Sequence, residues 1–436
     1  MILPLLPLAV WADFWNPEGG WIVLTAAATN AACAVVGCFL VLRRMSLMGD
    51  ALSHAVLPGL AVAFIWSGSY GIGPLLVGAV VAGLLSTFLT QTLHEYASVP
   101  SDASMGVVFT SLFALGVVLI KKYIHGVHFD MRCVYEGLLE LTPWSRWDVL
   151  GYELPRAAVM AVGMLIVNAA VIALLWKEFK LSAFDPALAT TMGFSAGVMH
   201  YLLMALVAVT AVASFEAVGS ILVVAMLVAP PATAHLLVDR LGPMVALAAL
   251  VGALAAVIGY VLGVWIDTNY AGMMTVSASG LYGLAVLFSP RYGIVSAGVR
   301  NMQTALRVVR EDLLAMLYRL EELRAPRRLA TAEAQQAVGG GLLARLGLRG
   351  LVRDGRVTSA GNQLELTTRG RDDAKQLVRS HRLWEAYLVQ YLGLPLDHVH
   401  EPAHRVEHFI GPELREELQH KLDETGVDPH GREIPS

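Results

Sequence analysis

The hydrophobic pattern divides the chain near residue 295. Before that position long apolar runs follow one another with few charges between them, and after it charged residues become frequent. A helix needs about 20 apolar residues to cross the hydrocarbon core of a bilayer, so the first part predicts membrane-spanning helices. We expect nine spans, over residues 21–42, 51–67, 73–93, 105–121, 155–176, 197–214, 218–238, 243–266 and 271–289.

Basic residues in the connections predict the orientation of these spans. Most fall on one side: Arg43, Arg44, Lys177, Lys180 and Arg291. The positive-inside rule makes that side cytosolic, although Lys121 and Lys122 lie on the other side. With nine spans the N-terminus faces outward, and we expect a multi-pass protein of the cell membrane, in contact with lipid, whose C-terminal domain is cytosolic. The two shortest runs also fit tilted or re-entrant segments, because Pro58 and Gly59 break helices, so eight or ten spans remain open.

Composition supports this division. The chain of 436 residues is 56% hydrophobic, which is too apolar for an ordinary soluble protein. The chain has 31 Lys and Arg residues and 35 Asp and Glu residues. Only 26 of all these charged residues precede residue 300. A net charge of −4 argues neither for nor against nucleic acid. Three cysteines are too few for a disulfide framework.

Asp50 and His54 are the first candidate metal ligands. Their spacing of four residues places them on one face of a helix. A carboxylate and an imidazole together suit Mn²⁺, Fe²⁺ or Zn²⁺, and ionisable groups at membrane depth are functional by default. The spacing alone leaves a second interpretation open, in which both groups lie at a helix end among headgroups and water.

Residues 43–59, with the sequence RRMSLMGDALSHAVLPG, resemble the signature of the zinc, manganese and iron importer permeases of the ATP-binding-cassette class. Phe184-Asp185-Pro186 and residues 216–234 are similar to that family as well, so the resemblance covers about residues 20–290. It implies a permease subunit with Asp50 and His54 on the translocation path of a divalent transition metal. It also implies three partners, namely an ATPase subunit, an extracytoplasmic metal-binding protein and a second permease subunit, either a copy of this chain or a paralogue.

The sequence offers no nucleotide-binding loop of its own. Such a loop needs G-x-x-x-x-G-K-[ST], and no Lys follows a Gly in this chain. We therefore expect a transport subunit and not an enzyme, with ATP hydrolysis in a separate subunit. The connection 177–193 resembles the docking region of the family for that subunit, although it also fits an ordinary solvated turn. The outward loop with His125, His128 and Asp130 fits a solvated connection better than a metal-receiving mouth.

Beyond residue 300 the pattern predicts a small α+β domain. Asp312–Leu323 repeats apolar residues at helical spacing, and turn residues within Arg353–Leu366 predict a short β-wing. We therefore expect a mainly α protein of three parts: a polytopic membrane domain over residues 1–295, a winged-helix-like domain over 300–375, and a helical domain over 376–436.

The tail concentrates metal-ligand side chains. Two segments carry them at helical spacing: His381 with Glu385, and His400 with His404, Glu407 and His408. Nitrogen and oxygen ligands without a thiolate favour Mn²⁺, Fe²⁺, Zn²⁺ or Co²⁺ over a structural zinc knuckle. A His-rich solvated surface is the alternative interpretation.

Residues from about 305 to 436 resemble the iron- and manganese-dependent repressor family, up to the closing segment 428–435. The resemblance implies that the six tail residues are metal ligands and adds Asp312 on the first helix. It also implies that residues 376–436 form a metal-binding and dimerisation domain and that the winged-helix-like domain over 300–375 is degenerate. One departure concerns the helix-turn-helix, which looks shortened and interrupted by Gly339, Gly340 and Gly341. Because glycine weakens a helix, the recognition helix looks interrupted and we do not favour DNA binding. We expect instead a domain that senses metal and regulates transport.

Two other functions fit parts of the pattern. A permease for a chelated metal or a corrinoid would need a wide path largely free of ligands, and Asp50 and His54 argue against it. A membrane-tethered, metal-dependent transcription regulator would need a continuous recognition helix. Mn²⁺, Fe²⁺ and Zn²⁺ all accept these ligands.

Overall fold

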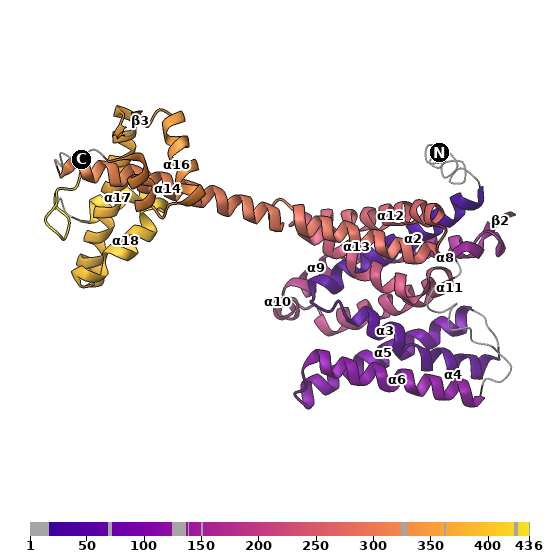
Figure 1. Cartoon of the computed structure of the whole chain (residues 1–436). Helices are drawn as coiled ribbons and strands as arrows, with labels where there is room; N and C mark the ends of the chain where they lie inside the picture. The colour runs from indigo at the N-terminus through magenta and orange to yellow at the C-terminus, as the bar shows by residue number, and fades with distance from the viewer. Residues whose placement is uncertain are drawn as a thin grey trace, which may run out of the picture. The chain divides into compact units, whose positions relative to one another are not determined.

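The computed structural model describes residues 17–68, 72–123, 137, 139–149, 151–323, 329–361, 363–422 and 426–435. The chain forms two compact units, Met1–Ser296 and Ala297–Ser436, and helices dominate both (Figure 1). Elements of the first unit are α2 (Pro17–Leu42), α3 (Met48–Ala55), α4 (Leu57–Ser67), α5 (Ile72–Tyr96), α6 (Ser101–Tyr123), η1 (Leu139–Leu141), β1 (Arg146–Val149), β2 (Tyr152–Pro155), α8 (Arg156–Leu174), α9 (Trp176–Phe184), α10 (Pro186–Thr191), α11 (Ala196–Leu237), α12 (Leu241–Ile266) and α13 (Tyr270–Phe288).

Within the described residues, eight helical segments are long and apolar enough to cross a membrane, and Leu222–Leu237 is a shorter apolar helix. Together they occupy the nine runs expected from the sequence. The run over residues 51–67 is divided into α3 and α4, which meet at Val56, and Pro58 lies in the first turn of α4. Proline is tolerated there because the first amides of a helix have no partner within it.

The two halves of α11 are separated at Gly219. This residue has φ 73° and ψ 165°, a conformation outside the helical region. Only glycine adopts such a conformation readily. The sequence therefore ends one apolar helix and starts the next without a loop.

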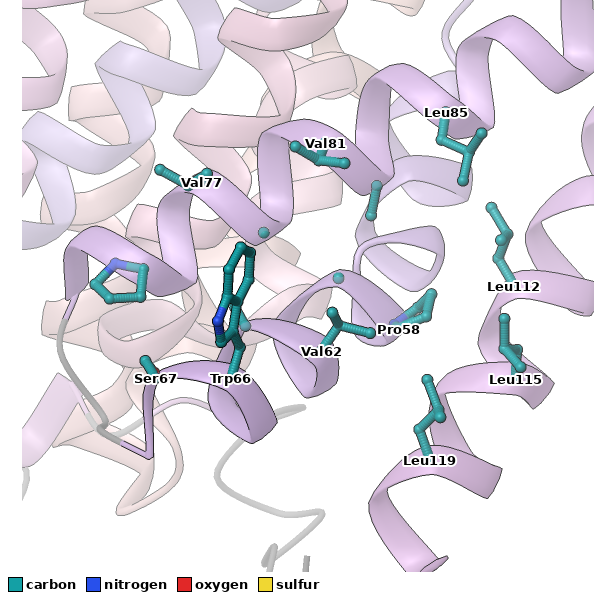
Figure 2. Close-up of a pocket in the computed structure, with 15 residues that line it drawn as sticks. Pro58, Val62, Trp66, Ser67, Val77, Val81, Leu85, Leu112, Leu115 and Leu119 are labelled. Atoms are coloured by element: carbon teal, nitrogen blue, oxygen red, sulfur yellow. The ribbon is translucent and has the colours of Figure 1, made fainter. Parts of the chain in front are cut away.

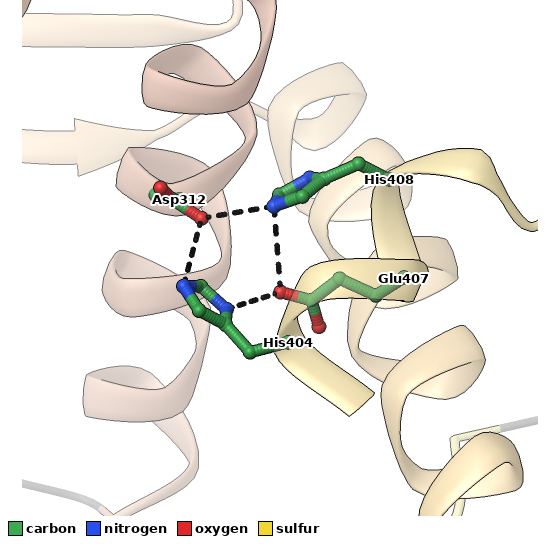
Figure 3. Close-up of side chains that lie close together, drawn as sticks. All are labelled: Asp312, His404, Glu407 and His408. Carbon is green, nitrogen blue, oxygen red and sulfur yellow. Dashed lines mark hydrogen bonds and ion pairs between the residues drawn. The ribbon is translucent and has the colours of Figure 1, made fainter. Parts of the chain in front are cut away.

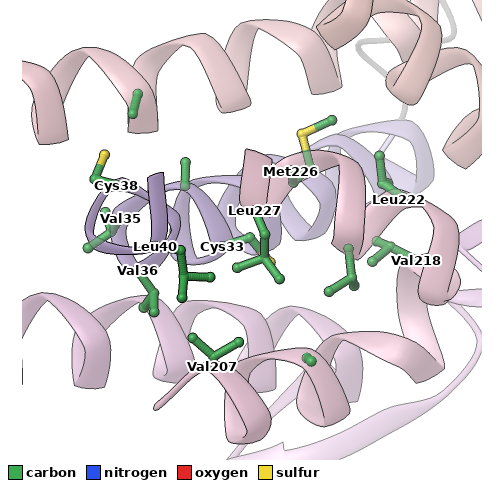
Figure 4. Close-up of a cluster of buried hydrophobic side chains, with 14 of the residues drawn as sticks. Cys33, Val35, Val36, Cys38, Leu40, Val207, Val218, Leu222, Met226 and Leu227 are labelled. Carbon is green, nitrogen blue, oxygen red and sulfur yellow. The ribbon is translucent and has the colours of Figure 1, made fainter. Parts of the chain in front are cut away.

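The core of the first unit surrounds α2, which packs against α8, α11 and α12. Figure 4 shows Val36, Leu40 and their neighbours on α2 facing Val207, Val218 and Leu227 of α11. Gly37 permits the close approach, since a Cβ at this position would overlap the carbonyl oxygen of Leu227.

An apolar groove of about 750 Å³ lies among α4, α5 and α6 (Figure 2). Val62 and Trp66 line it from α4, Val77 and Val81 from α5, and Leu115 from α6. None of its lining residues is charged. The groove therefore lacks the carboxylate and imidazole groups that bind divalent transition metals.

The second unit combines a small winged fold with a helical tail. Its elements are α14 (Ile294–Glu322, which begins just before the unit boundary), α15 (Thr331–Ala337), α16 (Gly341–Arg353), β3 (Val357–Ala360), β4 (Gln363–Leu366), α17 (Thr368–Leu392), η2 (Leu396–His398), α18 (His400–Val406), η3 (Glu407–Phe409) and α19 (Pro412–Lys421). Strands β3 and β4 pair antiparallel, with Val357 opposite Leu366. Separate hydrophobic clusters stabilise the winged part and the tail.

The expectation that three glycines interrupt the recognition helix is wrong. Gly339, Gly340 and Gly341 have φ values of 89°, 66° and 73°, and they form the turn between α15 and the start of α16. Positive φ is readily available to glycine, so these residues build the turn. Helix α16 then continues for 13 residues.

Candidate metal sites

Asp50 and His54, called here the membrane pair, both lie on α3. Asp50 occupies its first turn and His54 the next, with His54 Nε2 3.6 Å from Asp50 Oδ1. The imidazole stacks near the ring of Phe109 at a centroid distance of 6.0 Å and meets the edge of Phe113 at 5.5 Å. Leu52, on the same helix, is fully buried. The packed aromatic rings of α6 therefore hold the imidazole next to a carboxylate that is half exposed.

Among the described residues, Asp50 and His54 do not belong to any group of three or more possible ligands within 4.8 Å of one another. A site with two protein ligands leaves most coordination positions to water. Such a site holds a divalent ion weakly and releases it readily, which suits passage more than storage.

The seven candidate ligands of the second unit form two groups. Site A consists of Asp312 on α14, His404 on α18, and Glu407 and His408 in η3. In Figure 3 dashed lines join these four side chains in a closed ring. His404 Nδ1 lies 2.8 Å from Glu407 Oε1, and His408 Nε2 lies 3.4 Å from Asp312 Oδ1. Asp312 Oδ1 and His408 Nε2 are both buried and face each other, so an ion between them would contact both.

A second carboxylate fixes the His408 ring. His408 Nδ1 donates a hydrogen bond of 2.8 Å to Glu311 Oε2, and Arg307 Nε donates one of 2.9 Å to Glu311 Oε1. This arrangement leaves His408 Nε2 facing Asp312, as in sites where a histidine ligand donates its other ring N–H to a carboxylate. Sequence reasoning missed Glu311 and Arg307, although their spacing of four residues on one helix was a usable signal.

Nearby carboxylates control the charge of site A. Burial lowers the pKa of the His408 imidazole, but hydrogen bonds to Asp312 and Glu311 outweigh burial and raise it to about 9. Burial raises the pKa of the Glu407 carboxyl, yet hydrogen bonds with His381 and His404 lower it below its usual range. These interactions therefore hold the Glu407 carboxylate ionised and keep a proton on His408 near neutral pH.

Site B consists of His381 and Glu385 on α17 and His400 at the start of α18. Glu385 Oε1 lies 2.7 Å from His400 Nδ1 and 3.1 Å from His381 Nε2. His381 and Glu385 are buried, whereas His400 is exposed beside a cavity of about 370 Å³. Burial raises the pKa of the Glu385 carboxyl, but hydrogen bonds from both imidazoles outweigh burial and lower it to about 2.

Glu407 connects the two sites. Its Oε1 faces His404 in site A, while its Oε2 lies 2.6 Å from His381 Nδ1 in site B. The structure thus brings together all seven predicted cytosolic residues, in two adjacent groups. Asp50 and His54 form a separate pair in the first unit. The loop with His125, His128 and Asp130 lies outside the described residues.

Comparison with known proteins gives two family matches. Residues 367–436 match the iron dependent repressor, metal binding and dimerisation domain, a range that holds every residue of sites A and B except Asp312. Residues 20–289 match the ABC 3 transport family.

Individual relatives agree with the second match. The chain is 43% identical over 286 residues to the manganese transport system membrane protein MntD of Bacillus subtilis, covering 65% of this chain and 97% of that protein. It is 39% identical over 274 residues to the zinc transport system membrane protein TroD of Treponema pallidum, covering 63% and 75%. The solved structure of PsaBC from Streptococcus pneumoniae in complex with Fab has a TM-score of 0.56 and 29% identity, covering 66% of this chain and 97% of that chain. The chain belongs to the ABC 3 transport family.

Proposed function

We propose that this membrane protein is the permease subunit of an ATP-driven importer for Mn²⁺, Zn²⁺ or Fe²⁺, with Asp50 and His54 as the ligands on its path. Family membership and relatives named for manganese and zinc transport support the assignment. The observation that carries it is the Asp50–His54 pair on α3, a carboxylate and an imidazole 3.6 Å apart. A path for a chelated metal or a corrinoid would gain nothing from such ligands.

The proposed partners are an ATPase subunit, an extracytoplasmic metal-binding protein and a second permease subunit. For the ATPase, the docking segment comprises α9, α10 and the residues to Gly193. Asp185 caps α10 by accepting a hydrogen bond from the amide of Leu188. Phe184, Leu188 and Met192 are exposed along this segment. Large apolar side chains on a cytosolic turn fit a protein partner better than solvent.

The isolated chain is expected to show no ATP hydrolysis, because it has no P-loop sequence. Phosphate release from purified protein in detergent and in vesicles measures this. Adding the ATPase subunit should produce ATP hydrolysis and serves as the positive control. Turnover by the chain alone, retained after further purification, would contradict the proposed division of labour.

We also propose that the second unit senses cytosolic metal and regulates transport. Sites A and B would hold Mn²⁺, Fe²⁺ or Zn²⁺, since their donors are imidazole nitrogens and carboxylate oxygens without sulfur. Asp312 Oδ1 and His408 Nε2 face each other at 3.4 Å, and a bound ion would take the place of the proton between them. The match to a metal binding and dimerisation domain supports this proposal.

Metal binding to site A is expected to release protons at about pH 7. The pKa of His408 is raised to about 9, so its ring is protonated at neutral pH, and an ion must displace the proton from Nε2. Affinity should therefore rise with pH and level off near the pKa, with a slope of up to about tenfold per pH unit. Calorimetry in buffers of different ionisation enthalpy measures the proton count. An affinity that does not change with pH would show that His408 is not a ligand.

DNA binding is a second candidate function for this unit. Helix α16 is continuous and exposes Arg345, Arg349 and Arg353 at spacings of four residues. Such a basic face can contact phosphates. A gel-shift assay with the operator region of its own operon tests this function, and Arg345→Ala with Arg349→Ala should remove any shift that depends on α16.

A further inference from the structure

Arg43 connects three elements at the cytosolic end of α2. Its Nη2 donates a hydrogen bond of 2.7 Å to Ser182 Oγ of α9. Its Nη1 lies 3.3 Å from His200 Nδ1 of α11. Because a guanidinium can only donate, His200 Nδ1 accepts, which leaves the ring proton on Nε2. One side chain therefore joins α2, α9 and α11.

Aromatic packing strengthens the connection between α2 and α9. Phe39 of α2 and Phe179 of α9 are both fully buried, with ring centroids 5.4 Å apart. Trp176, at the start of α9, meets the edge of Phe39 at 6.5 Å. Ser182 is also buried and donates a hydrogen bond to the carbonyl oxygen of Phe179. The end of α2 and the buried face of α9 are thus packed together.

This body joins the docking segment to the membrane pair. On one side, α9 leads through Asp185 into α10. On the other, the tight turn after Arg43 leads into α3, which carries Asp50 and His54. Arg44 has a positive φ of 58° in this turn, and the amide of Met45 bonds back to the carbonyl of Leu40. A displacement of α9 would therefore move the end of α2, the tight turn after it and the start of α3 together.

We propose that Arg43 is a positioning residue for transport: its two polar contacts couple nucleotide-driven displacement of the docking segment to the Asp50–His54 pair. The proposal rests on the proposed function, because it needs an ATPase that acts on this segment. Arg43 itself does not contact the transported ion. Its loss should uncouple ATP hydrolysis from metal movement and leave ATPase docking intact.

The test uses the full permease with its ATPase and metal-binding protein in lipid vesicles, and Mn²⁺ as the probe. Arg43→Gln should still assemble and hydrolyse ATP, while Mn²⁺ moved per ATP falls at least about tenfold, since one hydrogen bond to a charged group changes an equilibrium by about that factor. Arg43→Lys keeps the charge but cannot hold both partners. Its ratio of Mn²⁺ moved per ATP should lie between those of the native permease and Arg43→Gln. Arg44→Gln is the matched control, because Arg44 is exposed.

A second readout separates this proposal from the proposed function. A spin label on exposed Leu47, in a variant without the native cysteines, should change mobility when nucleotide binds to the assembled complex. Arg43→Gln should abolish that change. If the native complex moves no metal, the proposed function fails, and the label still tests Arg43. Normal coupling or a retained label response in Arg43→Gln would overturn the role of Arg43, as would a parallel loss of ATPase binding.

Discussion

Replacing Asp50 with alanine abolishes metal uptake in our account, and so does replacing His54. Each variant removes one of only two protein ligands in the pair. A single remaining ligand cannot compete with water for a divalent ion, so uptake should fall by at least about a hundredfold, beyond what loss of an outer-shell partner causes. Both side chains are partly exposed, and the fully buried Leu52 of α3 stays in place in each variant. Membrane insertion and assembly with the ATPase should therefore persist.

Uptake of Mn²⁺, Zn²⁺ and Fe²⁺ by cells that lack their own importers measures this effect. Asp102→Asn and His94→Gln are suitable controls, because each removes a comparable group from an exposed position in the same unit. Asp50→Asn should resemble the alanine variant, since the amide keeps the shape but loses the charge. Normal uptake by either alanine variant would exclude this pair from the path.

The second large effect concerns site A. A fragment of residues 297–436 has its own hydrophobic clusters, so we expect it to fold alone and bind Mn²⁺. Replacing both His404 and His408 with alanine should weaken that binding by at least about a hundredfold, because half of the site's ligands are lost. Titration calorimetry measures both forms. The paired substitution His398→Ala with His420→Ala removes two exposed imidazoles outside the sites and should leave binding unchanged.

Site B gives an internal comparison for this fragment. His381→Ala removes a ligand of site B and also the imidazole beside Glu407 Oε2. It should lower the metal stoichiometry and weaken site A moderately. Equal metal binding by the native fragment and the His404→Ala, His408→Ala form would exclude site A as the metal site. A native fragment that binds no metal would reduce this unit to a dimerisation module.

The apolar pattern predicted the membrane-spanning helices well, because burial in lipid requires continuous apolar runs and leaves a strong signal. It pointed to a helix break near Pro58, which the structure has at Val56, but it did not show the turn formed by Gly339–Gly341. Glycine is compatible both with a weakened helix and with a turn of positive φ. Only the structure distinguishes these two uses.

Candidate ligands were predictable where they recur at helical spacing on one segment. Their division into sites A and B was not, because Asp312 lies far from His404 in sequence and meets it only through the packing of α14 against the tail. The roles of Glu311, Phe109 and Phe113 were missed for the same reason. Each acts on a histidine of another helix.

ATP-dependent metal uptake into vesicles that contain this chain, its ATPase subunit and its metal-binding protein is the decisive measurement of the proposed permease function. We predict accumulation of Mn²⁺, Zn²⁺ or Fe²⁺ that requires ATP and is lost in Asp50→Ala. Vesicles that accumulate none of these ions, or that accumulate them equally with and without ATP, would contradict the assignment of this chain as an ATP-driven metal permease.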